Sequence, residues 1–143
     1  MHLIWSYYIF EIALLLLRFL VMLVFVWSGW SHAKDPVASG KDLGFSAGFA
    51  KLLGIVEVLA GLGVGFGVLT RLSALGLMII MLGAMHRKAF VWKTGFWGKD
   101  SQGWHYDLIF FAINLLVFAG AGGPWTIANA VARVTGWAGL TRL

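Results

Sequence analysis

The sequence predicts an all-α integral membrane protein, folded as a four-helix bundle with a short hairpin between its second and third helices. Composition is the first reason. Of the 143 residues, 60% are hydrophobic and only 12% are charged, and the mean hydropathy is +0.86. A soluble domain has about 25% charged residues. The second reason is that the apolar residues fall into four long runs, each close to the length that crosses a bilayer as a helix. The length fits one domain, residues 1–143.

Charge and cysteine content exclude several classes of function. The net charge is +5 and the isoelectric point is about 9.9. The Lys and Arg residues are spread thinly between apolar runs, so they indicate membrane topology and lipid contacts and argue against nucleic-acid binding. The chain has no cysteine. This excludes disulfides, thiolate catalysis, iron–sulfur ligation and covalent haem attachment through cysteine.

The predicted helices cover about 12–31, 49–69, 71–88 and 105–121, and an interfacial tail follows at 124–143. Only three residues, Leu69 to Arg71, join the second and third helices, which predicts a tight antiparallel hairpin. Two polar loops lie together on the other side of the membrane, which we call the loop side; the opposite side is the hairpin side. The first loop can hold a short interfacial helix, and the second is rich in Trp and Phe. The positive-inside rule favours a cytoplasmic loop side.

The second helix carries a polar and glycine-rich face. Gly54, Glu57, Gly61 and Gly65 are spaced by three and four residues, so they share one face of the helix. Small residues at this spacing allow close helix approach. Glu57 is therefore expected to point into the protein. Gly76 and Gly83 predict a second close-packing stripe on the third helix.

Ionisable residues inside a membrane are costly, and they are candidates for function by default. The candidates are Arg18, Glu57 and Asp107, which we expect to be catalytic if the protein is an enzyme. Four more polar residues are candidates for binding a substrate or a quinone: Arg71, His86, His105 and Asn114. Depth along the helices predicts that these groups converge on the loop side, in a pocket beneath the aromatic loop.

Simpler interpretations stay open at several of these positions. Arg18 and Glu57 can form a structural ion pair that only holds the bundle together. His86 and His105 are typical interfacial histidines, and they would ligate haem only if both rings faced one cavity. Asp107 at a helix start is stabilised by the macrodipole, so capping competes with catalysis. His32 is expected to be an exposed interfacial residue. We predict no metal site.

The chain resembles the DoxX family of small membrane proteins. The resemblance rests on Leu17-Arg18-Phe19 with Phe25 and Gly29, on Gly54-x-x-Glu57-x-x-x-Gly61-x-x-x-Gly65 followed by Thr70-Arg71, on His86 and Gly95-Phe96-Trp97, and on Trp104-x-Tyr106-Asp107. It implies a four-helix bundle in the bacterial cytoplasmic membrane, a quinone as cofactor, and links to thiosulfate:quinone oxidoreduction and to oxidoreductase complexes of stress responses. One departure is His105, where the family often has Glu.

Two functions from different classes follow. The first is a quinone-linked oxidoreductase subunit, in which Glu57 supplies protons and an arginine or histidine holds a quinone carbonyl. The second is a non-catalytic subunit that anchors or scaffolds a larger membrane complex through its glycine-rich faces. Expected partners are the lipid bilayer and other membrane subunits or further copies of the chain. A small transporter is less favoured, because no inverted repeat is evident.

Overall fold

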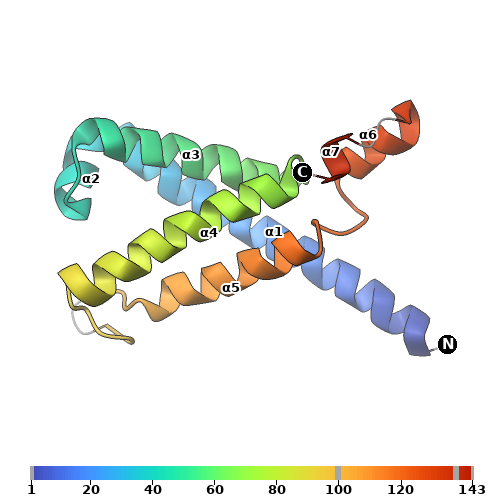
Figure 1. Cartoon of the computed structure of the whole chain (residues 1–143), viewed down its shortest axis with the longest axis horizontal. Coiled ribbons are helices and arrows are strands. Elements are labelled where there is room, and N and C mark those ends of the chain that lie inside the picture. The colour runs from blue at the N-terminus through green and yellow to red at the C-terminus, as the bar shows by residue number, and fades with distance from the viewer. Residues whose placement is uncertain (1, 99–100, 137–138, 143) are drawn as a thin grey trace.

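The computed structural model describes residues 2–98, 101–136 and 139–142, and in these ranges every regular element is helical (Figure 1). The all-α prediction is confirmed for this part of the chain. The elements, in chain order, are α1 His2–Lys34, α2 Pro36–Leu43, α3 Ala47–Phe66, α4 Thr70–His86, the π-helical turn η1 Arg87–Val91, α5 His105–Ala119, α6 Ile127–Thr135 and α7 Gly139–Arg142.

Three helical stretches are long and apolar enough to cross a membrane: Trp5–Lys34, Ala47–Phe66 and Thr70–Val91. The protein is therefore a multi-pass membrane protein that contacts the lipid bilayer. The helix α5 is apolar but has only 15 residues. Its length is about 22 Å, less than the roughly 30 Å of a hydrocarbon core. A fourth crossing by α5 stays a prediction.

The helix α1 is longer than the sequence analysis predicts. It begins at His2, ten residues before the predicted start, and it runs for 33 residues to Lys34. Figure 1 shows it crossing the other helices obliquely, with its N-terminal part projecting beyond the hairpin side of the bundle. One stripe of α1 is buried at alternating spacings of three and four residues, and it starts at Glu11 and continues through Leu14, Arg18 and Val21.

The helix ends follow from local sequence. Asp35 caps α2 through a bond from the Ala38 N–H, and Pro36 occupies the first turn, where no N–H is needed. Gly67, at φ 72°, ends α3 in the left-handed conformation that glycine adopts without cost. This end comes three residues before the predicted one at 69. Only Gly67 to Leu69 separate α3 from α4, so the two helices form a hairpin.

Glycines let α1 and α3 approach closely. A Cβ atom on Gly54 would lie 2.5 Å from the Gly29 carbonyl oxygen, and one on Gly61 would lie 3.2 Å from the Phe25 Cβ. The prediction of a second such stripe on α4 is wrong. A Cβ on Gly76 or Gly83 would have no neighbouring atom within 4 Å, so no described helix packs closely at either position.

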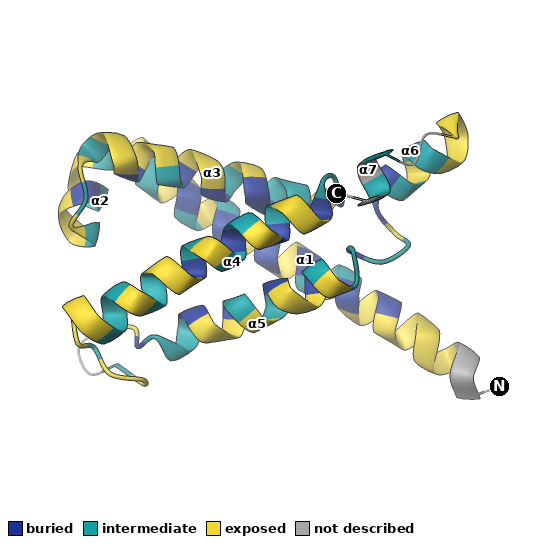
Figure 2. Ribbon diagram, in the orientation of Figure 1, coloured by how far each residue is buried: buried dark blue, intermediate teal, exposed yellow. Residues whose placement is uncertain are grey.

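The hydrophobic core lies between α1, α3, α4 and α5, and its members include Val21, Phe25, Val64, Leu77 and Val117. Figure 2 shows buried residues on the inward faces of these helices and exposed residues on the outward faces. Many outward residues are large and apolar, as expected where lipid is the solvent. The candidate site is formed by polar side chains near the ends of these helices and not by the hydrophobic core.

Candidate functional site

Glu57 is buried on α3, and its partner is His32 of α1. The His32 Nδ1 lies 3.1 Å from Glu57 Oε2, and the two side chains are 23% and 4% exposed. The packing of glycines explains the pair. His32 follows Gly29 by one helical turn on α1, and Gly29 packs against Gly54, which lies one turn before Glu57. The expectation that His32 is merely an exposed interfacial residue is wrong.

Arg18 does not pair with Glu57. Its guanidinium donates to four backbone carbonyls: Nε to Val64 at 2.9 Å, Nη2 to Gly65 at 2.8 Å, and Nη1 to Gly122 at 2.9 Å and Trp125 at 2.8 Å. Two of the acceptors lie in the last turn of α3, where carbonyls lack helical partners and favour a cation. These two acceptors, Val64 and Gly65, follow Glu57 by seven and eight residues, which is about 11 Å along the axis of α3.

The predicted Arg18–Glu57 ion pair is therefore wrong, and so is a single pocket that contains both groups. The predicted depths assume that α1 and α3 begin at the predicted residues and that their axes are parallel. The actual axial offset of the helices brings Arg18 to the hairpin side and leaves Glu57 nearer the loop side. Arg18 joins α1, the end of α3 and the turn after α5, so its contacts are those of a structural residue.

A second acid–base pair lies at the loop side. The Lys88 Nζ is 2.8 Å from Asp107 Oδ2, and the two side chains are 15% and 5% exposed. Lys88 belongs to η1, and Asp107 to the first turn of α5. The contact is an ion pair without hydrogen-bond alignment. Asp107 accepts no capping bond from a backbone N–H in the described part of the chain, so Lys88 is its chief partner.

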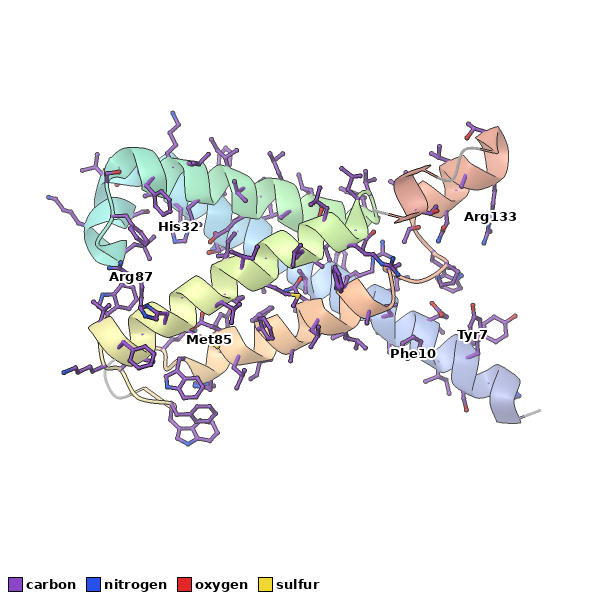
Figure 3. The ribbon with its side chains drawn as sticks, in the orientation of Figure 1. Tyr7, Phe10, His32, Met85, Arg87 and Arg133 are labelled. Carbon is purple, nitrogen blue, oxygen red and sulfur yellow. The ribbon has the colours of Figure 1, made fainter. Side chains whose placement is uncertain are left out.

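Both pairs line one cleft with a volume of about 660 Å³. Its walls are mainly apolar and come from α1, α3 and α4, with Phe25, Phe49 and Met81 among them. At the loop side, Trp92 and Tyr106 complete the lining. Figure 3 shows His32 and Arg87 together at this end of the bundle. The result is a cleft with apolar walls and a polar, partly aromatic end.

Arg87 lies at the polar end of the cleft in an unusual setting. Its guanidinium carbon is 4.3 Å from the centre of the Phe45 ring and 5.5 Å from that of Trp92. Cations are attracted to aromatic faces at such distances. The Nε of Arg87 is buried and has no hydrogen-bond partner in the described part of the chain. Arg87 as a residue lines the cleft.

Of the seven candidate residues from the sequence, three line this cleft: Glu57, His86 and Asp107. The other four do not. His105 is held by a bond of its Nδ1 to the Phe96 carbonyl at 2.8 Å. Asn114 is buried and donates to the Phe110 carbonyl of its own helix at 2.8 Å. Because only one of the two histidines lines the cleft, the arrangement that haem ligation by His86 and His105 requires is not formed.

Arg71, the remaining candidate, lines a different cavity of about 330 Å³ at the hairpin side. Its walls come from the N-terminal part of α1, the start of α4, the glycine turn after α5, and α6 and α7. Glu11 is its buried acidic residue, with 8% of the residue exposed. Glu11 is not among the residues predicted from the sequence, because it lies before residue 12, the predicted start of the first helix. The spacing of Glu11 from Leu14 and Arg18 could have revealed it, because it continues their helical stripe.

The protein-family comparison agrees with the motifs on α1, α3 and α4. The DoxX family model matches residues 13–92. This segment contains Arg18, His32 and Glu57, and it ends before α5 and Asp107. No curated protein matches the chain. No solved structure matches it either. The matched segment covers more than half of the 143 residues, and the chain therefore belongs to the DoxX family.

Proposed function

We propose that this DoxX protein binds a quinone in the loop-side cleft and takes part in quinone-linked oxidoreduction at the bacterial cytoplasmic membrane. The observation that carries the proposal is the combination found in the cleft. It has apolar walls within the membrane-spanning helices, and it also has two acid–base pairs, His32–Glu57 and Lys88–Asp107. An amphiphilic ring with two carbonyl oxygens needs both features.

The residues present fit such a ring. A volume of about 660 Å³ lies in the range of small-molecule sites, which is roughly 300–1,000 Å³. Quinone carbonyls accept hydrogen bonds, and donors face the cleft from Arg87, Lys88 and Tyr106. The Arg87 guanidinium lies against the rings of Phe45 and Trp92, which restricts its position at the polar end of the cleft.

The acid–base pairs supply the proton chemistry. A bound quinone takes up two electrons and two protons when it is reduced to the quinol. The 3.1 Å contact between His32 and Glu57 can hold one proton between the imidazole and the carboxylate, within the cleft. Lys88 and Asp107 line the same cleft as a second pair. With no cysteine in the chain, the electrons come from a substrate or from a partner protein.

Binding of a short-chain quinone tests this proposal. Decylubiquinone and a menaquinone analogue are titrated into the purified protein, and binding is followed by quenching of the fluorescence of the eight Trp residues, of which Trp92 lines the cleft. The Glu57→Gln variant should bind about tenfold more weakly, which corresponds to about 1.4 kcal/mol. Arg71→Gln, at the opposite end of the bundle, should bind as the wild type does. The proposal fails if neither quinone binds, or if both variants bind equally well.

A second candidate is the anchoring subunit, and the uncovered face of α4 favours it. Gly76 leaves open space where another helix could pack closely, whereas the open space beside Gly83 belongs to the loop-side cleft. This candidate predicts that the wild-type protein copurifies with further membrane subunits and that Gly76→Leu abolishes the association. A bound quinone in a sample without partner subunits would favour the first candidate instead.

A further inference from the structure

The hairpin-side cavity contains a buried carboxylate that the quinone proposal does not use. Glu11 is more than nine-tenths buried and lines this cavity. No hydrogen bond or ion pair reaches its carboxylate from any residue that the structure describes, and its Oε2 is shielded from solvent. A buried carboxylate without a partner is costly. A donor or a cation that enters the cavity would remove this cost.

The surrounding turn holds the Glu11 carboxylate at the cavity wall. A Cβ atom on Gly123 would collide with Glu11 Oε2, so the turn passes close to the carboxylate because it has no side chain there. Asn129 fixes this turn by donating its Nδ2 to the Gly123 carbonyl at 2.9 Å. The position of Glu11 is therefore defined by its neighbours, and the carboxylate has little freedom to turn out to solvent.

A positive subsite faces the same cavity. Arg71 lines it and is exposed, and it forms no ion pair with Glu11. It lies in the first turn of α4, where backbone N–H groups and the helix macrodipole favour an anion. Leu69, the residue before this helix, provides no side-chain cap. One cavity thus offers a negative and a positive group that do not neutralise each other.

We propose that this cavity binds a zwitterionic phosphoamine group, with its ammonium at Glu11 and its phosphate at Arg71 and the first turn of α4. The charge separation excludes a simple anion, which Glu11 would repel, and disfavours a lone metal ion, since Glu11 is the only acidic residue among the described residues that line the cavity. The proposal is independent of quinone binding, because none of the residues that the structure describes lines both cavities.

Two sources carry this chemistry, a phosphatidylethanolamine headgroup and a free phosphoamine. The cavity lies at the level of the α3–α4 turn, where headgroups meet the hairpin side of the bundle. Tyr7 at its edge belongs to the α1 extension, whose residues Trp5 to Phe10 are exposed and largely aromatic or aliphatic. Figure 3 shows Tyr7 on this projecting segment.

Calorimetric titration of the purified full-length protein in detergent tests the proposal. The probes are dioctanoyl phosphatidylethanolamine, dioctanoyl phosphatidylglycerol, which lacks the ammonium, and free phosphoethanolamine. The wild type should bind the phosphatidylethanolamine about tenfold more tightly than the phosphatidylglycerol. Glu11→Gln should abolish this preference and Glu11→Asp should keep part of it. Arg71→Gln should weaken the binding of both lipids.

Each result bears on the proposal. Binding of phosphoethanolamine as tight as that of the lipid identifies a soluble ligand, and binding of the lipid alone identifies a headgroup site; either supports the proposal. Equal affinity of the wild type for the two lipids overturns it, as does a preference that survives Glu11→Gln. If Glu11→Gln does not fold, the exposed Arg71→Gln variant decides, and unchanged lipid affinity in that variant overturns the proposal. Glu57→Gln, in the other cleft, is the matched control and should keep the wild-type preference.

Discussion

Arg18 and Glu57 are both charged, both buried and both in membrane-spanning helices, yet their surroundings differ completely. Arg18 donates to four backbone carbonyls and lines neither cavity described above. Glu57 has one partner, His32, and lines a cleft of about 660 Å³. A buried charge in a membrane is therefore not by itself a functional site. Arg18, which uses four of its five N–H donors on backbone carbonyls, stabilises the fold, whereas Glu57, which has open space beside it, is available for chemistry.

The largest effect that follows from this comparison concerns Arg18. The Arg18→Ala variant leaves two buried and two partly buried carbonyls without their charged donor, and each buried one costs about 1–3 kcal/mol. We expect the free energy of unfolding to fall by at least about 3 kcal/mol, measured by unfolding in SDS from mixed micelles. Arg18→Lys keeps one charged donor group, so its free energy of unfolding should lie between those of the wild type and Arg18→Ala. A loss below about 1 kcal/mol in Arg18→Ala would contradict the structural role of this residue.

A smaller effect separates the covered and uncovered glycine faces. Gly54→Ala forces a Cβ against the Gly29 carbonyl oxygen, and overpacking of this kind costs about 1–3 kcal/mol. Gly76→Ala meets no atom within 4 Å and should be neutral or stabilising by up to about 1 kcal/mol. The same unfolding assay compares them. Equal effects of the two variants would show that the α1–α3 crossing is not as close as described.

Much of the fold could be predicted from the sequence because it depends on local pattern. Apolar runs gave the long helices, and the spacing of Gly54, Glu57 and Gly61 correctly turned Glu57 inward. The pairing of polar groups could not be predicted in the same way. It depends on how far one helix is shifted along another. A shift of two turns separates Arg18 from Glu57, so that Arg18 binds backbone carbonyls instead of the Glu57 carboxylate.

The ion-pair partners of the acidic residues also depend on how the helices are placed relative to one another. Glu57 pairs with His32, and Asp107 with Lys88. His32 could have been found from its position one turn after Gly29, because this glycine had to pack against the glycine face of Glu57. Lys88 could not, since its direction depends on the π-helical turn η1, and no sequence pattern considered above indicates such a turn. The Arg87 setting between Phe45 and Trp92 depends on the same turn.

The central claim is that a quinone binds in the cleft between the His32–Glu57 and Lys88–Asp107 pairs, and photolabelling tests it most directly. A photoreactive quinone analogue is cross-linked to the purified protein, and the labelled residues are mapped by peptide mass spectrometry. The account predicts labels on cleft residues such as Met81 and Trp92, which disappear when excess decylubiquinone is present. Labels that resist this competition, or that lie on outward residues such as Leu59 and Leu72, would contradict it.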